Sequence, residues 1–67
     1  MGRDYEVLRR KILGKYGSLA PFAQELSITP STLSLKLQGN SDWRRAEIER
    51  CAELLELTQE EIVAIFF

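Results

Sequence analysis

The sequence predicts an all-α fold, a compact domain of four to five helices. Apolar residues recur at spacings of three and four in almost every segment, and no segment alternates polar and apolar residues as a strand does. Residue types that begin or end helices separate these segments. A chain of 67 residues has room for one domain, so we expect a single helical domain over residues 1–67.

The first predicted helix has one apolar face, which is formed by Tyr5, Leu8, Ile12 and Tyr16. Asp4 belongs to the residue types that cap helix N-termini. Gly17 is placed to end the helix, because glycine adopts the left-handed conformation common at helix C-termini.

Two short helices are predicted next, with a very tight connection between them. Ser18 is a good N-cap for the earlier one, and Pro21 is tolerated inside its first turn. The later one begins at Thr29-Pro30, a capping residue followed by a proline at the first helical position, and ends at Gly39. Two short helices joined in this way form the skeleton of a helix-turn-helix, which we place at about residues 18–39.

Two further helices are predicted in the second half of the chain. One spans roughly residues 44–56 and has one apolar face, formed by Ile48, Cys51, Ala52 and Leu55. The last opens with the capping box Thr58-Gln59-Glu60-Glu61 and continues to the C-terminus.

The composition argues against several functional classes. The chain has no histidine and one cysteine, Cys51, which excludes an intrachain disulfide and leaves no zinc ligand set. It has no glycine-rich phosphate loop and no serine or cysteine with an obvious catalytic partner, so we expect no enzyme activity and no cofactor, metal or small-molecule ligand. No apolar run approaches the ~18 residues of a membrane span, and the N-terminus lacks a signal-like stretch. These features predict a cytoplasmic protein.

The charges are unevenly distributed along the chain. Residues 1–45 carry eight basic and four acidic side chains, a net charge of +4, whereas residues 46–67 carry one basic and six acidic side chains, a net charge of −5. This polarity suits a molecule that offers one end to a polyanion such as nucleic acid. The alternative is two solvated helical faces with no partner.

The segment from Phe22 to Leu33 meets the steric demands of a helix-turn-helix. Ala23 is small where the two helices cross, and Ile28 is apolar just after the turn. Ser27 is the exception, because such turns usually carry glycine, and we expect either a strained backbone there or a slightly shifted turn.

The order FAQELSITPSTLSLKLQG, Trp43, Glu47-Ile48 and LLELTQEEIVAIFF resembles small phage regulators of the lambda-repressor-like, Cro-type helix-turn-helix family. The resemblance covers about residues 8–67. It implies a fold of four or five helices whose third helix enters the DNA major groove, and members that bind paired half-sites as dimers. By this resemblance the protein is a sequence-specific transcriptional regulator that represses by occupying an operator in double-stranded DNA.

The third predicted helix has a mixed polar face suited to base contacts. At about 100° per residue, Leu33 and Leu37 point to the core, and the opposite face carries Ser31, Ser34, Leu35 and Gln38. Gln38 suits adenine, serines suit several base edges, and Leu35 suits a thymine methyl group. The full predicted DNA-binding set is Ser18, Thr29, Ser31, Thr32, Ser34, Leu35, Lys36, Gln38, Asn40, Arg44 and Arg45. The alternative is a polar face that is merely solvated.

The sequence departs from the family it resembles at four positions. Related sequences usually carry arginine where this chain has Pro30 and Leu35, and glutamine and lysine where it has Leu19 and Ala20. Because basic residues supply most non-specific affinity, we expect weaker DNA binding, or phosphate contacts from other groups such as Lys15 and the DNA-binding set above. The alternative function is a helix-turn-helix scaffold for protein–protein interaction, such as an antirepressor, with Leu35 and Leu19 exposed.

Three predictions concern the rest of the molecule. Trp43 is expected to plug the core over the loop, the alternative being that it stacks on a base, and Cys51 is expected to be an inert buried thiol. In the last helix, Ile62, Ile65 and Phe66 are expected in the core. Val63 and Phe67 form a second apolar stripe, which predicts a homodimer through the C-terminal helix. Alternatively, these two residues cover an edge of their own core.

Overall fold

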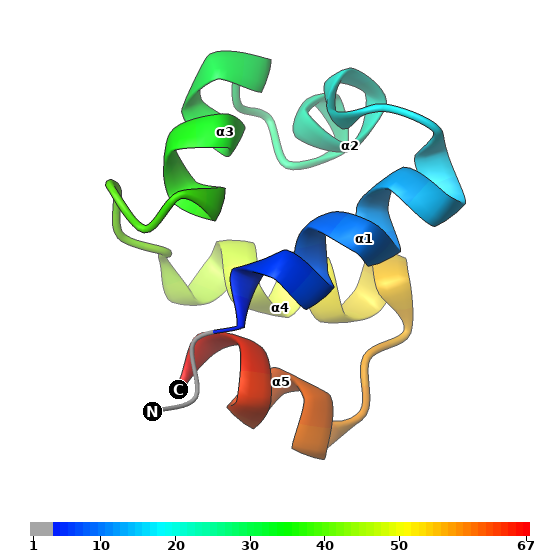
Figure 1. The fold of residues 1–67 in the computed structure, drawn as a ribbon, viewed down its shortest axis with the longest axis vertical. Helices are drawn as coiled ribbons and strands as arrows, with labels where there is room; N and C mark the ends of the chain where they lie inside the picture. Colours follow the sequence, from blue (N-terminus) through cyan, green and yellow to red (C-terminus); the bar gives the residue numbers. More distant parts are fainter. Residues whose placement is uncertain (1–3) are drawn as a thin grey trace.

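The chain folds into five helices, described by a computed structural model over residues 4–67 (Figure 1). In order they are α1 Tyr5–Tyr16, α2 Leu19–Glu25, α3 Pro30–Leu37, α4 Arg45–Leu55 and α5 Gln59–Phe66. No strand occurs within residues 4–67. The radius of gyration of 10.6 Å is close to the value of about 11 Å expected for a compact domain of this length. The prediction of a compact all-α fold is therefore confirmed.

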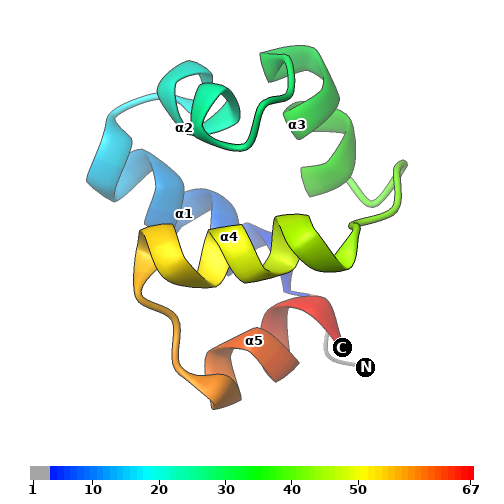
Figure 2. The same ribbon diagram turned by 180° about the vertical axis from the view of Figure 1, so that it is seen from behind.

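The helices are arranged so that α1 and α4 lie between two ends of the molecule. Figures 1 and 2 show α2 and α3 at one end and α5 at the other. Helix α1 packs against all four other helices, whereas α3 packs directly on α1 and α2. Within residues 4–67, no helix covers the face of α3 opposite the buried Leu33.

The core is formed by residues from all five helices and is centred on α1. The buried apolar residues are Leu8, Ile12, Phe22, Ala23, Leu26, Leu33, Cys51, Ile65 and Phe66. Tyr5 and Tyr16 are partly buried and pack against this cluster, as the spacing of α1 predicts. Ile62 is partly buried rather than fully buried.

The helix ends follow the predicted capping residues with one difference. Asp4 accepts a hydrogen bond from Val7 N at 3.4 Å, and Thr29 accepts one from Thr32 N at 3.1 Å. The capping box of α5 is formed by bonds of 3.1 Å and 2.8 Å. Ser18 occupies the N-cap position of α2, but its side chain makes no capping hydrogen bond.

The turn between α2 and α3 contains a strained residue, as predicted. Ser27 has a φ of 61°, in the left-handed region that L-residues other than glycine rarely adopt. This conformation lets Ile28 N donate to Ala23 O at 3.0 Å, which closes the turn over the buried Ala23. Helices α2 and α3 are thereby held at a fixed angle by a very short connection.

Two structural features are absent from residues 4–67. No helix in this range is both long and apolar enough to cross a bilayer. The same residues contain no cluster of three or more histidine, cysteine, aspartate or glutamate side chains that would hold a metal ion.

Candidate nucleic-acid interface

The uncovered face of α3 carries four of the predicted contact residues. Ser31 and Gln38 are exposed, Ser34 is half-buried, and Leu35 is 47% exposed. Leu33, which points the other way, is fully buried. The helix therefore presents a small, mainly polar surface with one leucine near its centre, as its periodicity predicts.

Hydrogen bonds order the C-terminal part of this face. Gln38 Nε2 donates to Ser34 Oγ at 3.4 Å, and Asn40 Nδ2 donates to Gln38 Oε1 at 3.2 Å. The Gln38 amide is thus oriented by neighbours on both sides, and it keeps further donor and acceptor capacity toward solvent.

The two threonines at the start of α3 are engaged with each other. Thr29 Oγ1 accepts from Thr32 N and donates to Thr32 Oγ1 at 2.9 Å. Thr29 therefore caps α3, and Thr32 Oγ1 accepts the Thr29 hydroxyl proton, which leaves the Thr32 hydroxyl proton free for another partner.

Lys36 was predicted to contact a DNA phosphate, but the structure places its side chain inside the protein. Its side chain is only 6% exposed, and its ammonium group donates to Asp42 O at 2.6 Å and pairs with Glu47 Oε1 at 3.0 Å. The same nitrogen lies 5.7 Å from the centre of the Trp43 ring. Lys36 therefore joins α3 to the following loop and to α4, and its charge is not available to a phosphate. Its position next to Leu37 on α3 places it at the border of the apolar face, where a long side chain follows the core inward.

Glu47 is the counterion of Lys36 and also caps α4. Burial alone raises the pKa of Glu47, but the hydrogen bond from Arg44 N at 2.9 Å and the hydrogen bond and charge of Lys36 together bring it below 4.5. Beside this pair, Trp43 packs edge-on against Phe66 with ring centres 5.1 Å apart. Its buried Nε1 has no hydrogen-bond partner among the described residues. Trp43 thus covers the core, as predicted.

The other predicted cations are in different environments. Arg44 is exposed at the N-cap of α4, next to the loop that follows α3. Arg45 is also exposed but pairs with Glu49 at 3.2 Å, on the side of α4 that faces α5. Of these two arginines, Arg44 is the one that forms no ion pair within residues 4–67.

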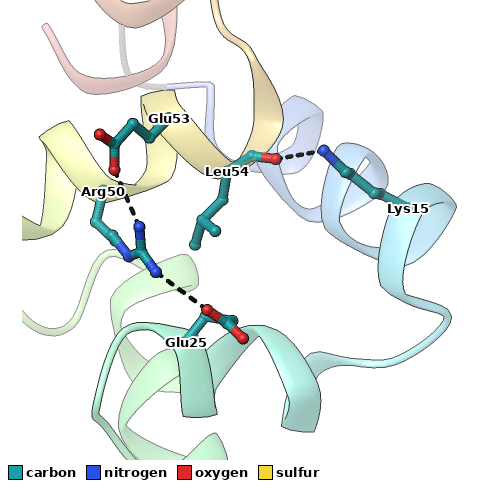
Figure 3. Close-up of polar contacts among 5 residues, drawn as sticks. All are labelled: Lys15, Glu25, Arg50, Glu53 and Leu54. Atoms are coloured by element: carbon teal, nitrogen blue, oxygen red, sulfur yellow. Dashed lines mark hydrogen bonds and ion pairs between the residues drawn. The ribbon is translucent and has the colours of Figure 1, made fainter.

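Exposed polar contacts connect α4 to α1 and α2 (Figure 3). Arg50 pairs with Glu25 of α2 at 3.1 Å and with Glu53 at 3.0 Å. Lys15 of α1 donates to the carbonyl oxygen of Leu54 at the end of α4 (Figure 3). Lys15 is therefore committed to an intramolecular contact rather than to the surface of α3.

Leu19, at the start of α2, is less exposed than predicted. Leu19 is half-buried and packs against the core, whereas Ala20 is exposed. Leu19 lies in a polar cleft of about 290 Å³ between α1 and the α2–α3 unit, which is lined by Glu6, Arg9, Leu19, Ser34, Leu37 and Gln38. Two of these lining residues, Ser34 and Gln38, belong to the predicted DNA-binding set. Arg9 does not, because the sequence of α1 does not show which helix its polar side meets.

At the other end of the molecule, α5 exposes two apolar side chains. Val63 is 53% exposed and Phe67 is 62% exposed. Phe67 also borders a groove of about 860 Å³ between α4 and α5, whose apolar lining includes Trp43, Ile48, Ala52 and Ile62. The predicted apolar stripe is therefore present on the surface of the single chain.

The fold and this surface define a small all-α protein with an ordered, uncovered helix face at one end. A family model described as "Protein of unknown function (DUF739)" matches residues 1–67, and the chain belongs to this family. No curated protein matches the chain. The family description names neither a ligand nor an activity, so the resemblance to lambda-repressor-like regulators stays a prediction.

Proposed function

We propose that this protein is a sequence-specific DNA-binding transcriptional regulator of the small phage-repressor kind, with α2 and α3 as its helix-turn-helix. The observation that carries the proposal is the uncovered face of α3, held at a fixed angle to α2 by the turn at Ser27. A rigid, solvent-facing helix on a tight turn is what insertion into a major groove requires.

The side chains on this face suit direct contacts with base edges. An α-helix with its side chains is about 10–12 Å across, which fits the major groove of about 12 Å width, and α3 offers eight residues to place there. Gln38 offers the donor and acceptor that pair with adenine, Ser31 and Ser34 offer hydroxyls, and Leu35 offers an apolar contact for a thymine methyl group. Occupancy of an operator would then exclude polymerase.

Few positive charges support this binding. Arg44 is exposed next to the loop that follows α3, and the free backbone N–H groups at the start of α2, near Ser18, can bind a phosphate oxygen. Because Lys15 and Lys36 are engaged within the protein, we expect a weak non-specific affinity and a shallow dependence on salt.

The second part of the proposal is a homodimer through α5. Val63 and Phe67 supply exposed apolar surface, and the neighbouring groove offers a place for apolar side chains of a second copy. Because α5 and α3 lie at opposite ends of a molecule 26 Å long, two copies joined at α5 leave room for α3 helices spaced by one DNA turn of about 34 Å (Figure 1).

Selection from a random pool of double-stranded DNA tests this function. At about 0.15 M salt, where purely electrostatic binding is suppressed, we expect enrichment of a palindrome with half-sites about one helical turn apart. A folded sample that enriches no sequence would refute the proposal.

A protein-binding scaffold is the second candidate function. Its support is Leu35, which is 47% exposed on a face without basic residues, in a chain with a net charge of −1. Leu19, being half-buried, does not add to this support. Replacement of Leu35 by arginine separates the two functions: tighter DNA binding with no loss of a protein partner favours the regulator, and loss of a protein partner favours the scaffold.

A further inference from the structure

The cleft between α1 and the α2–α3 unit places one arginine of α1 beside the face of α3. Ser34 and Gln38, which line this cleft, also belong to the face proposed to contact bases. Arg9 lines the opposite wall and is exposed. A cation in this position lies at the edge of the α3 face, where the phosphate backbone bordering a major groove would pass.

Arg9 has no competing counterion in the described part of the chain. Glu6, the acid in the same cleft, pairs with Arg10 at 3.5 Å. Within residues 4–67 each of the other lysines and arginines except Arg44 forms an ion pair, namely Arg10, Lys11, Lys15, Lys36, Arg45 and Arg50. Two guanidinium groups are thus left without an ion pair in this range: Arg9, which lines the cleft beside the α3 face, and Arg44, which follows the loop after α3 at the N-cap of α4.

Neither α2 nor α3 presents a positively charged side chain on this side. The segment of α2 contains no basic residue, and the single basic residue of α3, Lys36, is buried against Glu47. A protein that binds DNA through this unit must take its phosphate contacts from neighbouring elements, since such contacts position a helix in the groove.

We propose that Arg9 is a phosphate-binding residue, which contacts the DNA backbone beside α3 and so orients that helix in the groove. This inference rests on the proposed DNA-binding function and adds a contact from α1 to it. The planar guanidinium group suits two parallel hydrogen bonds to phosphate oxygens. Glu6 in the same cleft opposes the phosphate, so that the two residues have opposite effects on affinity.

The test compares two variants of α1 that remove the same charge. Arg9→Gln removes the proposed contact, whereas Lys11→Gln removes a cation that pairs with Glu61 of α5 at 2.9 Å, away from the cleft. Fluorescence anisotropy is measured with a fluorescein-labelled random-sequence duplex of about 30 base pairs, about three helical turns, over a series of salt concentrations. We expect Arg9→Gln to lower affinity about tenfold and to reduce the salt slope by about one, and Lys11→Gln to change both much less.

A variant that is expected to change the affinity in the opposite direction supports the comparison. Glu6→Gln, made together with Arg10→Gln so that no other cation is released, removes the carboxylate from the cleft and is expected to raise affinity for the same duplex by a few fold relative to Arg10→Gln alone. This variant also keeps the inference testable if Arg9→Gln lowers the amount of folded protein, which circular dichroism would show.

The outcomes separate this inference from the function on which it rests. Equal affinities and salt slopes for Arg9→Gln and Lys11→Gln, or no change when Glu6→Gln is added to Arg10→Gln, would overturn the role of Arg9 while DNA binding by the unmodified protein stands. Absence of DNA binding by the unmodified, folded protein at low salt would overturn both.

Discussion

At the scale of single residues, the pair formed by Lys36 and Glu47 is the least exposed ion pair among residues 4–67. The two side chains are 6% and 14% exposed, whereas at least one partner of each other pair is a third or more exposed. Exposed pairs contribute little to stability, but removal of one partner from a desolvated pair leaves a charge without a counterion. The stability of the α3–α4 connection therefore depends on both residues.

We expect Glu47→Gln to lower the free energy of unfolding by about 1–2 kcal/mol at neutral pH. The glutamine oxygen still accepts from Arg44 N, so the loss reports the charge. Because the pKa of Glu47 is below 4.5 in the fold, its stabilisation is present above 4.5 and is lost as the pH falls through the folded pKa. The difference between the two proteins in urea unfolding should thus narrow below pH 4.5.

The matched control for this prediction is Glu60→Gln, which removes an exposed carboxylate in the first turn of α5. Its effect should be within about 0.5 kcal/mol. A difference between the unmodified protein and Glu47→Gln that stays constant down to low pH would contradict the role of the Glu47 charge.

Cys51 is predicted to be unreactive while the protein is folded. Burial, followed by the nearby charge of Glu47, raises the pKa of the Cys51 thiol to about 12, so almost no thiolate exists at neutral pH. We expect a thiol reagent to modify Cys51 only when the fold opens, at a rate that rises with added urea. A Cys51→Ala, Ser31→Cys variant, with its thiol on the exposed face of α3, should react at once. Immediate modification of Cys51 in native buffer would contradict the prediction.

At the scale of elements, two helix ends contain non-glycine residues in the left-handed conformation. Ser27 follows α2 with a φ of 61°, and Glu56 ends α4 with a φ of 54°. Each of these two residues costs conformational free energy that a glycine would not, so the backbone is strained at both helix ends.

We expect Ser27→Gly to raise the free energy of unfolding by about 1 kcal/mol, since glycine adopts this conformation without a steric penalty. Ser34→Gly, in the interior of α3, is the control and should lower it by about 0.5 kcal/mol through reduced helix propensity. Thermal unfolding measures both changes. A less stable Ser27→Gly protein would mean that the serine side chain contributes more to the turn than its backbone costs.

The position of α3 depends on the contacts of the Lys36 side chain as well as on helix packing. Helix α3 packs directly on α1 and α2, and Lys36 connects it to α4 through Asp42 O and Glu47. A change at Lys36 is therefore expected to alter the angle of α3 without touching its exposed face.

At the scale of the whole molecule, the ends of the domain have different surfaces. The α2–α3 end has a mainly polar face with Arg9 at its edge, and the α5 end has the exposed side chains of Val63 and Phe67. This separation would allow one end to bind DNA while the other binds a second copy.

The double variant Val63→Gln, Phe67→Gln is expected to be a folded monomer under conditions in which the unmodified protein sediments as a dimer. Both side chains are more than half exposed, so their replacement removes little from the core. Leu13→Gln, which changes an exposed apolar residue of α1, is the control and should remain dimeric. Analytical ultracentrifugation distinguishes these states, and a double variant that is still dimeric would exclude α5 as the interface.

The sequence by itself determined the helices, their ends and most of the core. Asp4, Gly17, Thr29 and the capping box of α5 act within about four residues along the chain, and helical spacing selects the side that is buried. Such interactions are local, and a pattern along one segment contains them. The exposed face of α3 followed from the same periodicity.

Only the tertiary structure decided the environment of charged and border residues. It buried Lys36 against Glu47, tied Lys15 to Leu54, packed Leu19 on the core and placed Arg9 beside the face of α3. Each of these depends on contacts between helices that are distant in sequence, and the period of a single helix does not show which neighbour its side meets.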